Sequence, residues 1–197
     1  MFFTLASEGN TPNPMGENFI KFHDALVAHT PKGMRWEWAR YPDEDHGSTV
    51  LRAHYAGLKF VFDGWQIPRD AQFNLVGGLA GVEAHYKELS KRFGYPIPVP
   101  EATMNNIGYQ LLGQKKFDDA IIAFKRNVEV YPDSANVYDS LGEGLEGAGK
   151  FEEANANFQK ALELATRSGD GNLSVFKQHV ERVAAEMKTA SASAEAK

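Results

Sequence analysis

Residues 101–134 read EATMNNIGYQLLGQKKFDDAIIAFKRNVEVYPDS, and residues 135–168 read ANVYDSLGEGLEGAGKFEEANANFQKALELATRS. Shifting the chain by 34 residues superimposes small and aromatic residues at matched positions. The matched pairs are Gly108 and Gly142, Leu111 and Leu145, Phe117 and Phe151, Ala120 and Ala154, and Phe124 and Phe158. A repeat at this spacing is typical of stacked helical hairpins. This stretch therefore predicts a helical array in the C-terminal half.

The residue types explain why such a unit folds as two helices. Gly108 and Ala120 are small, so the helices that carry them can approach each other closely. Phe124 then fills the space between hairpins. Pro132 ends the first unit, because a proline removes a helical hydrogen bond and clashes with the preceding turn. Each unit is thus predicted to be a helix, a short polar turn and a returning helix.

This pattern resembles the tetratricopeptide repeat over roughly 70 residues. It departs from the family at Asn127, where a small residue is usual, and at Thr166, where a proline is usual. Both departures predict weaker packing at the edges of the unit. Because two repeats leave apolar faces uncovered, helices at 79–93 and 173–187 are expected to cover the two ends. The resemblance implies a protein partner bound in a groove of the array, and the alternative is that so short an array only packs or makes a dimer contact.

The N-terminal part shows a different periodicity. Residues 1–7 are apolar and predict a strand, and residues 34–41 alternate with a period of two, as in a half-buried strand. Residues 18–29 and 48–65 carry apolar side chains at spacings of three and four, which predicts helices. The order strand, helix, strand, helix indicates a parallel α/β arrangement. A strand pair with open edges is expected to associate with another chain or to be covered by the repeat helices, so we expect a homo-oligomer.

The loop after the second strand contains the motif that gives the most specific indication of chemistry. Residues 41–48 read YPDEDHGS and place His46 between a strand and a helix. In α/β hydrolases the catalytic acid precedes the histidine in the chain. Residues 1–66 resemble the C-terminal end of the α/β-hydrolase family that is related to esterase D and to siderophore esterases. The resemblance implies a hydrolase of carboxylic esters, with His46 as general base and Glu8 orienting its imidazole.

Other parts of such a site are absent or ambiguous. The nucleophile elbow G-x-S-x-G does not occur in the chain, so the candidate nucleophile is Ser48, a residue of another chain or an activated water. Trp36 and Trp38 share one face of the second strand, where they line a substrate pocket or form core. Asp43 and Asp45 offer oxygen ligands for Ca²⁺ or Mg²⁺ as the minor alternative to a site without metal. No cofactor is predicted.

The amino-acid composition excludes several classes of function and partner. The chain has no cysteine, which excludes disulfides and thiolate sites. Its net charge of −5 without a concentrated basic surface argues against nucleic acid as a partner. No apolar run approaches the roughly 20 residues that span a bilayer, so no membrane partner is expected. The first residues lack the basic region of a signal peptide, and the compartment stays open.

Together these patterns predict a mixed, mostly α fold. Residues 1–66 form an α/β-hydrolase-like remnant of two strands and two helices, and residues 67–100 are a linker and a connecting helix. Residues 101–188 hold two tetratricopeptide-like repeats with a closing helix, and residues 189–197 are a disordered tail of low complexity. The main functional hypothesis is an esterase-like hydrolase, or the C-terminal part of one. The alternative is a non-enzymatic module for protein interaction or oligomerisation.

Overall fold

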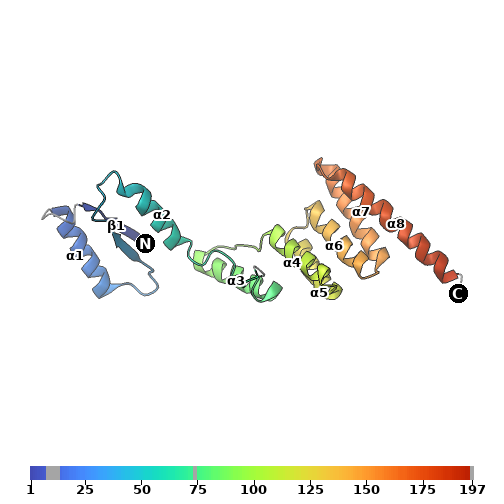
Figure 1. The fold of residues 1–197 in the computed structure, drawn as a ribbon, viewed down its shortest axis with the longest axis horizontal. Helices are drawn as coiled ribbons and strands as arrows, with labels where there is room; N and C mark the ends of the chain where they lie inside the picture. The colour runs from blue at the N-terminus through green and yellow to red at the C-terminus, as the bar shows by residue number, and fades with distance from the viewer. Residues whose placement is uncertain (8–13, 73–74, 196–197) are drawn as a thin grey trace. The chain divides into compact units, whose positions relative to one another are not determined.

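The computed structural model describes residues 1–7, 14–72 and 75–195. Within them the fold is mostly helical, with eight helices and two short strands. The chain divides into two compact units, Met1–Gln66 and Ile67–Lys197. We call the first the N-terminal unit and the second the array unit (Figure 1). Each is described by itself.

The N-terminal unit is a parallel strand pair with two helices. Its elements are β1 (Phe2–Leu5), α1 (Pro14–His29), β2 (Glu37–Arg40) and α2 (Thr49–Val61). The strands pair in parallel, with Phe2 opposite Glu37. Parallel strands need a crossover connection, and α1 supplies it. The predicted element order and parallel pairing are confirmed, although both strands are shorter than the predicted 1–7 and 34–41.

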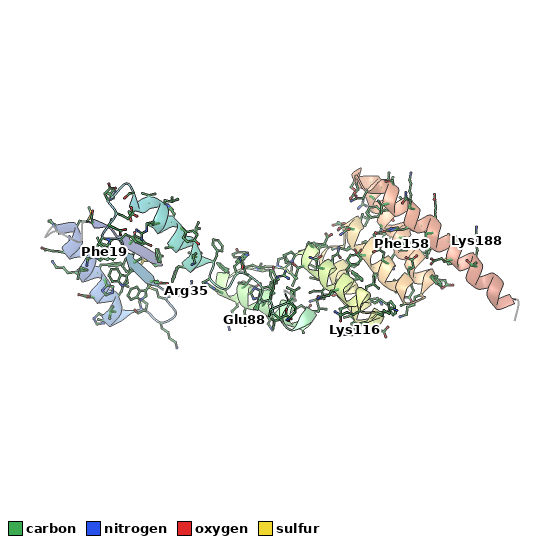
Figure 2. All side chains as sticks on the ribbon, in the orientation of Figure 1. Phe19, Arg35, Glu88, Lys116, Phe158 and Lys188 are labelled. Carbon is green, nitrogen blue, oxygen red and sulfur yellow. The ribbon has the colours of Figure 1, made fainter. Side chains whose placement is uncertain are left out.

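Both faces of this sheet are covered by helices. Neighbouring strand residues point to opposite faces, so Phe2 and Phe3 enter different layers. The ring of Phe3 contacts Phe19 of α1, with centroids 5.3 Å apart (Phe19 is labelled in Figure 2). The ring of Phe2 contacts Phe60 of α2 at 5.8 Å. Two-sided burial of this kind is what parallel sheets require.

The array unit is a succession of antiparallel helices. They are α3 (Gly78–Phe93), α4 (Glu101–Gly113), α5 (Phe117–Val130), α6 (Ala135–Gly147), α7 (Phe151–Ser168) and α8 (Leu173–Glu195). The helices α4 and α5 form the first predicted hairpin, and α6 and α7 form the second (Figure 1). The predicted turns between the paired helices adopt a left-handed backbone at equivalent positions, with φ 61° at Lys115 and 75° at Gly149.

Glycine positions set the closeness of the helices. A Cβ atom on Gly108 would lie 2.3 Å from the ring of Phe124, and one on Gly142 would lie 2.5 Å from the ring of Phe158. Gly144 also faces Phe124, and a Cβ atom there would lie 2.8 Å from its ring. Phe124 therefore packs on its own hairpin and on the next one. Phe158, labelled in Figure 2, lies in the second hairpin, and both phenylalanines are fully buried.

The two residues that depart from the repeat pattern, Asn127 and Thr166, affect the structure in different ways. Asn127 is fully buried, and its amide nitrogen donates to Asn105 Oδ1 at 2.7 Å and to the Glu101 carbonyl at 3.1 Å. The larger residue thus links α5 to α4 instead of loosening the unit. Thr166 allows α7 to reach 18 residues, against 14 for α5, because no proline stops it.

Flanking helices cover both ends of the repeats, as predicted. Val82 of α3 is fully buried in one cluster with Met104 and Ile107 of α4. At the other end, Phe176 and Val183 of α8 are buried against the second hairpin. The helix α8 continues to Glu195, through most of the segment 189–197 for which low complexity predicts disorder. Alanine is the strongest helix former, which accounts for the continuation.

Among the described residues, none of the helices combines the length and the apolar composition that crossing a membrane requires.

Candidate functional site

The loop at residues 41–48 lies at the carboxyl end of the strand pair. It follows β2, and the backbone N–H of Ser7, which follows β1, donates to the Glu44 carbonyl at 2.9 Å. The ends of the two strands are therefore joined through the loop that contains His46. Glu8, the predicted acid, comes next in the chain and lies outside the described residues.

Asp45 and Ser48 build the start of α2. Asp45 Oδ1 accepts the N–H groups of Gly47 at 2.8 Å and Ser48 at 2.7 Å, and the Asp45 N–H donates to Ser48 Oγ at 2.9 Å. This reciprocal arrangement is a capping box. The two backbone hydrogen bonds hold the pKa of the Asp45 carboxyl below its usual range. Ser48 has helical backbone angles, with φ −75° and ψ −29°, and not the strained turn of a nucleophile elbow.

The remaining acids of the loop pair with one arginine. Arg52 Nη1 donates to Asp43 Oδ2 at 2.9 Å and to Glu44 Oε1 at 2.8 Å, and its guanidinium lies 4.5 Å from the Tyr41 ring centroid. A backbone hydrogen bond, and next Arg52, hold the pKa of Asp43 low. A hydrogen bond from Ser48, and next Arg52, do the same for the pKa of Glu44. Asp43 and Asp45, the alternative metal ligands, thus face different partners.

The predicted pocket residues lie away from the histidine loop. His46 is exposed in the turn before α2. Trp38 packs on α1, with its ring 4.8 Å from that of His23, and Trp36 stacks on Phe3 at 5.7 Å. Trp36 also lines an open cleft of about 540 Å³ together with Arg35. That cleft opens where β2 begins, whereas His46 follows the end of β2, so the structure does not bring the tryptophans and the histidine together.

A second polar constellation crosses the array unit. Asp139 and Glu143 lie one turn apart on α6, and His179 of α8 stands between them. His179 Nδ1 is 2.8 Å from Asp139 Oδ1, and its Nε2 is 3.8 Å from Glu143 Oε1. On the other side, Tyr109 of α4 donates to Ser140 Oγ at 3.0 Å. One network thus joins α4, α6 and α8.

Two further contacts extend this network along the same three helices. Arg182 of α8 binds Glu146 of α6 through Nε at 2.8 Å and Nη2 at 2.5 Å. Asn136 of α6 donates to Glu101 Oε1 of α4 at 2.8 Å. We call the surface formed by these side chains the polar face. It comprises Glu101, Tyr109, Asn136, Asp139, Glu143, Glu146, His179 and Arg182.

Burial changes the acid–base properties of the polar face. Desolvation raises the pKa of Asp139, and the hydrogen bond from His179 offsets only part of that effect. Desolvation also raises the pKa of Tyr109 well above its usual range, so this side chain stays a neutral hydrogen-bond donor. Desolvation disfavours the charged form of both groups. The polar face therefore holds a buried carboxylate at an energetic cost.

This cost predicts a pH dependence. Because the pKa of Asp139 is higher in the folded than in the unfolded chain, its contribution to stability is fully present below the unfolded pKa and is lost as the pH rises through the folded pKa. Asp139→Asn removes that titration. As the pH rises from below about 3.9, the usual pKa of an aspartate, we expect the urea midpoint of the variant to increase relative to that of the wild type. A difference that stays constant as the pH rises would contradict the prediction.

Sequence reasoning missed the cluster of Asp139, Glu143 and His179. The one signal in the sequence that could have indicated it is the pair of acids four residues apart, inside a helix with apolar neighbours. The histidine is 40 residues away from Asp139 and outside the repeat, so only the packing of α8 brings it to the acids. Among the predicted site residues that the structure describes, only the loop that contains His46 is joined to another part of the predicted site, the end of β1.

Comparison with known proteins supports the helical part. Residues 100–167 match the family model described as tetratricopeptide repeat. The match spans both hairpins, so the predicted tetratricopeptide repeats are confirmed for this part of the chain. It does not extend into the N-terminal unit, for which the hydrolase resemblance stays a prediction. No curated protein matches the sequence.

Several solved structures are similar to this chain. Protein BPP2914 from Bordetella parapertussis has 19% sequence identity over 51% of this chain and 88% of its own, with a TM-score of 0.40. MamA 41-end from Desulfovibrio magneticus RS-1 has 19% identity over 56% of this chain and 66% of its own, with a TM-score of 0.33. The structure MamA MSR-1 C2 has 18% identity over 73% of this chain and 92% of its own, with a TM-score of 0.32.

Proposed function

We propose that this chain, as a carrier of two tetratricopeptide repeats, is a protein-interaction module that binds a segment of a partner protein through the polar face. The observation that carries the proposal is the repeat match over residues 100–167. Stacked helical repeats bind their partners along the extended surface that the stacking creates. The polar face is such a surface, because its side chains come from three successive layers of the array.

Tyr109 is the proposed anchor for the partner. It is 40% exposed although its ring packs edge-on against Phe124, with centroids 5.2 Å apart, and its hydroxyl is held by Ser140. A tyrosine fixed in this way loses little conformational freedom on binding. Tyrosine is also among the residues that contribute most to interface energy.

The charge of the polar face defines the partner. It carries four carboxylates, on Glu101, Glu143, Glu146 and the buried Asp139, against the cationic Arg182 and the imidazole of His179. The excess of acid favours a segment that presents lysine or arginine, because complementary charge speeds association and excludes acidic competitors. We infer that the partner segment is basic.

The test is a selection from a random peptide display library on the full chain. We expect the selected peptides to be rich in lysine and arginine, and Tyr109→Ala to weaken their binding by more than about tenfold. Ile122→Ala is the matched control, because Ile122 is 58% exposed on α5, outside the polar face. Peptides without basic residues, or equal losses in the two variants, would overturn the proposal.

A second proposal concerns the N-terminal unit. We propose that it is the C-terminal part of an ester hydrolase, with His46 as general base and Glu8 as its orienting acid. The parallel β1–α1–β2–α2 order and the hydrogen bond between Ser7 and Glu44 at the strand ends support it. The nucleophile in this proposal is Ser48, a serine of another chain, or a water activated by His46.

Hydrolysis of short-chain nitrophenyl esters tests this second proposal. If His46 is the base, His46→Ala should lower the rate of the purified chain by about 10²–10⁴-fold, the usual contribution of general base catalysis. His54→Ala is the matched control, because His54 is exposed on α2 and bonds to a carbonyl of its own helix. Equal rates for wild type and His46→Ala, or no rate above buffer, would exclude an esterase in this chain.

A further inference from the structure

The array unit holds a group of metal-ligating side chains between α6 and α8. Asp139, Glu143 and His179 each offer one ligand atom, and these atoms all lie within 4.8 Å of one another. The two acids share one face of α6, since residues four apart are neighbours on a helix. His179 reaches them from α8 because Phe176 and Val183 anchor that helix on the second hairpin.

The site is largely enclosed by protein. The side chains of Asp139, His179 and Glu143 are 9%, 13% and 28% exposed. The ring of His179 also packs on that of Phe158, with centroids 5.3 Å apart. The three ligand atoms are thus surrounded mostly by protein and partly by an aromatic ring. The effective dielectric constant is lower there than in water, so charges at the site interact strongly.

The charges around the site do not balance. Asp139 and Glu143 bring two negative charges, and His179 neutralises at most one of them. The guanidinium of Arg182 is the cation that faces the site from α8, yet Glu146 already binds it through two hydrogen bonds. From α4, Tyr109 brings a neutral hydroxyl. Buried charges in proteins are usually paired or bound to a metal ion, so these carboxylates are suited to a cation.

We propose that Asp139, Glu143 and His179 bind a divalent transition-metal cation, with Zn²⁺ as its representative, and that the ion joins the closing helix α8 to the second repeat. One imidazole nitrogen and two carboxylate oxygens are a ligand set that suits Zn²⁺ and its neighbours. Ca²⁺ and Mg²⁺ prefer oxygen ligands alone. Three protein ligands leave a fourth position for water.

The side chains must rotate to reach one ion, because His179 Nδ1 faces Asp139 whereas its Nε2 faces Glu143. Bond lengths of about 2.0–2.2 Å around a tetrahedral centre place ligand atoms about 3.4 Å apart, which is closer than the widest separation here. The movement falls mainly on Glu143, whose side chain is the most exposed of the three ligands.

Calorimetric titration of Zn²⁺ into the full chain tests the site, with the visible absorption of Co²⁺ as a second measurement on the same ligands. We expect one ion per chain for the wild type. Glu143→Gln and His179→Gln should each weaken binding by more than about tenfold, because each removes a ligand. Glu163→Gln and His54→Gln are the matched controls, since both residues are exposed and outside the site, and they should bind as the wild type does.

Two results would overturn the inference. One is wild-type binding no tighter than that of Glu143→Gln. The other is a loss of affinity in either control that equals the loss in the ligand variants. His179→Gln could loosen α8 by leaving Asp139 without its partner, so Glu143→Gln, at a partly exposed position, carries the test if the first variant does not fold. The peptide selection is done with a chelator present, and this separates the metal site from partner binding.

Discussion

Phe124→Ala should lower the free energy of unfolding of the array unit by about 3–5 kcal/mol, the usual cost of emptying an aromatic core position. Phe124 is fully buried. Its ring faces Gly108 of its own hairpin and Gly144 of the next, and it meets Tyr109 edge-on at 5.2 Å. Neighbouring side chains cannot easily fill this space, because glycines form two of its walls. The urea midpoint, followed by helical circular dichroism, measures the effect.

Ile122→Ala on the same helix is the control for this prediction. Ile122 is 58% exposed, so its truncation removes little packing. We expect a loss below about 1 kcal/mol, as for ordinary surface positions. Losses of similar size in the two variants would mean that Phe124 is not the residue that joins the hairpins.

Gly142→Ala should lower the free energy of unfolding by about 1–3 kcal/mol, as overpacking of a core does. The added Cβ would lie 2.5 Å from the ring of Phe158, which is itself fully buried and cannot swing away. The helix α6 would have to move away from α7. Elsewhere in a helix, the same change is usually favourable, because alanine restricts the unfolded chain more than glycine does.

Gly113→Ala provides the comparison that separates these two effects. Gly113 is the last residue of α4, and a Cβ there meets nothing within 4 Å. We therefore expect an unchanged or higher stability, by up to about 1 kcal/mol. Thermal unfolding should show a lower midpoint for Gly142→Ala and an equal or higher midpoint for Gly113→Ala. A stabilised Gly142→Ala would show that the helices do not depend on close approach at this position.

The N-terminal unit was largely predictable from local pattern. Alternation around Trp36 and Trp38 indicated a strand, and the apolar start of the chain indicated its partner. The lengths were not predictable, because two isolated strands pair only where their residues meet in register, from Phe2 opposite Glu37 to Leu5 opposite Arg40. Pairing between strands is a tertiary property that a single strand does not encode.

The loop at 41–48 shows why a site is harder to predict than a fold. Polar residues before a helix serve for capping as well as for catalysis, and the sequence does not distinguish the two roles. In the structure, Asp45 and Ser48 hold the turn that precedes α2, and Asp43 pairs with Arg52. Both roles need the same residue types at the same end of a strand. The histidine between them stays a candidate base by its place alone.

The amino-acid sequence alone defines the repeat, because small and aromatic residues 34 positions apart specify the hairpin and its stacking. It also determined that other helices must cover the ends, since an apolar face cannot be left in water. Which polar side chains come into contact depends on how the helices pack. Asp139, Glu143 and His179 come together because α8 packs on the second hairpin with His179 facing α6. That packing is set by apolar side chains such as Val183, which gives no indication of a polar site in the sequence.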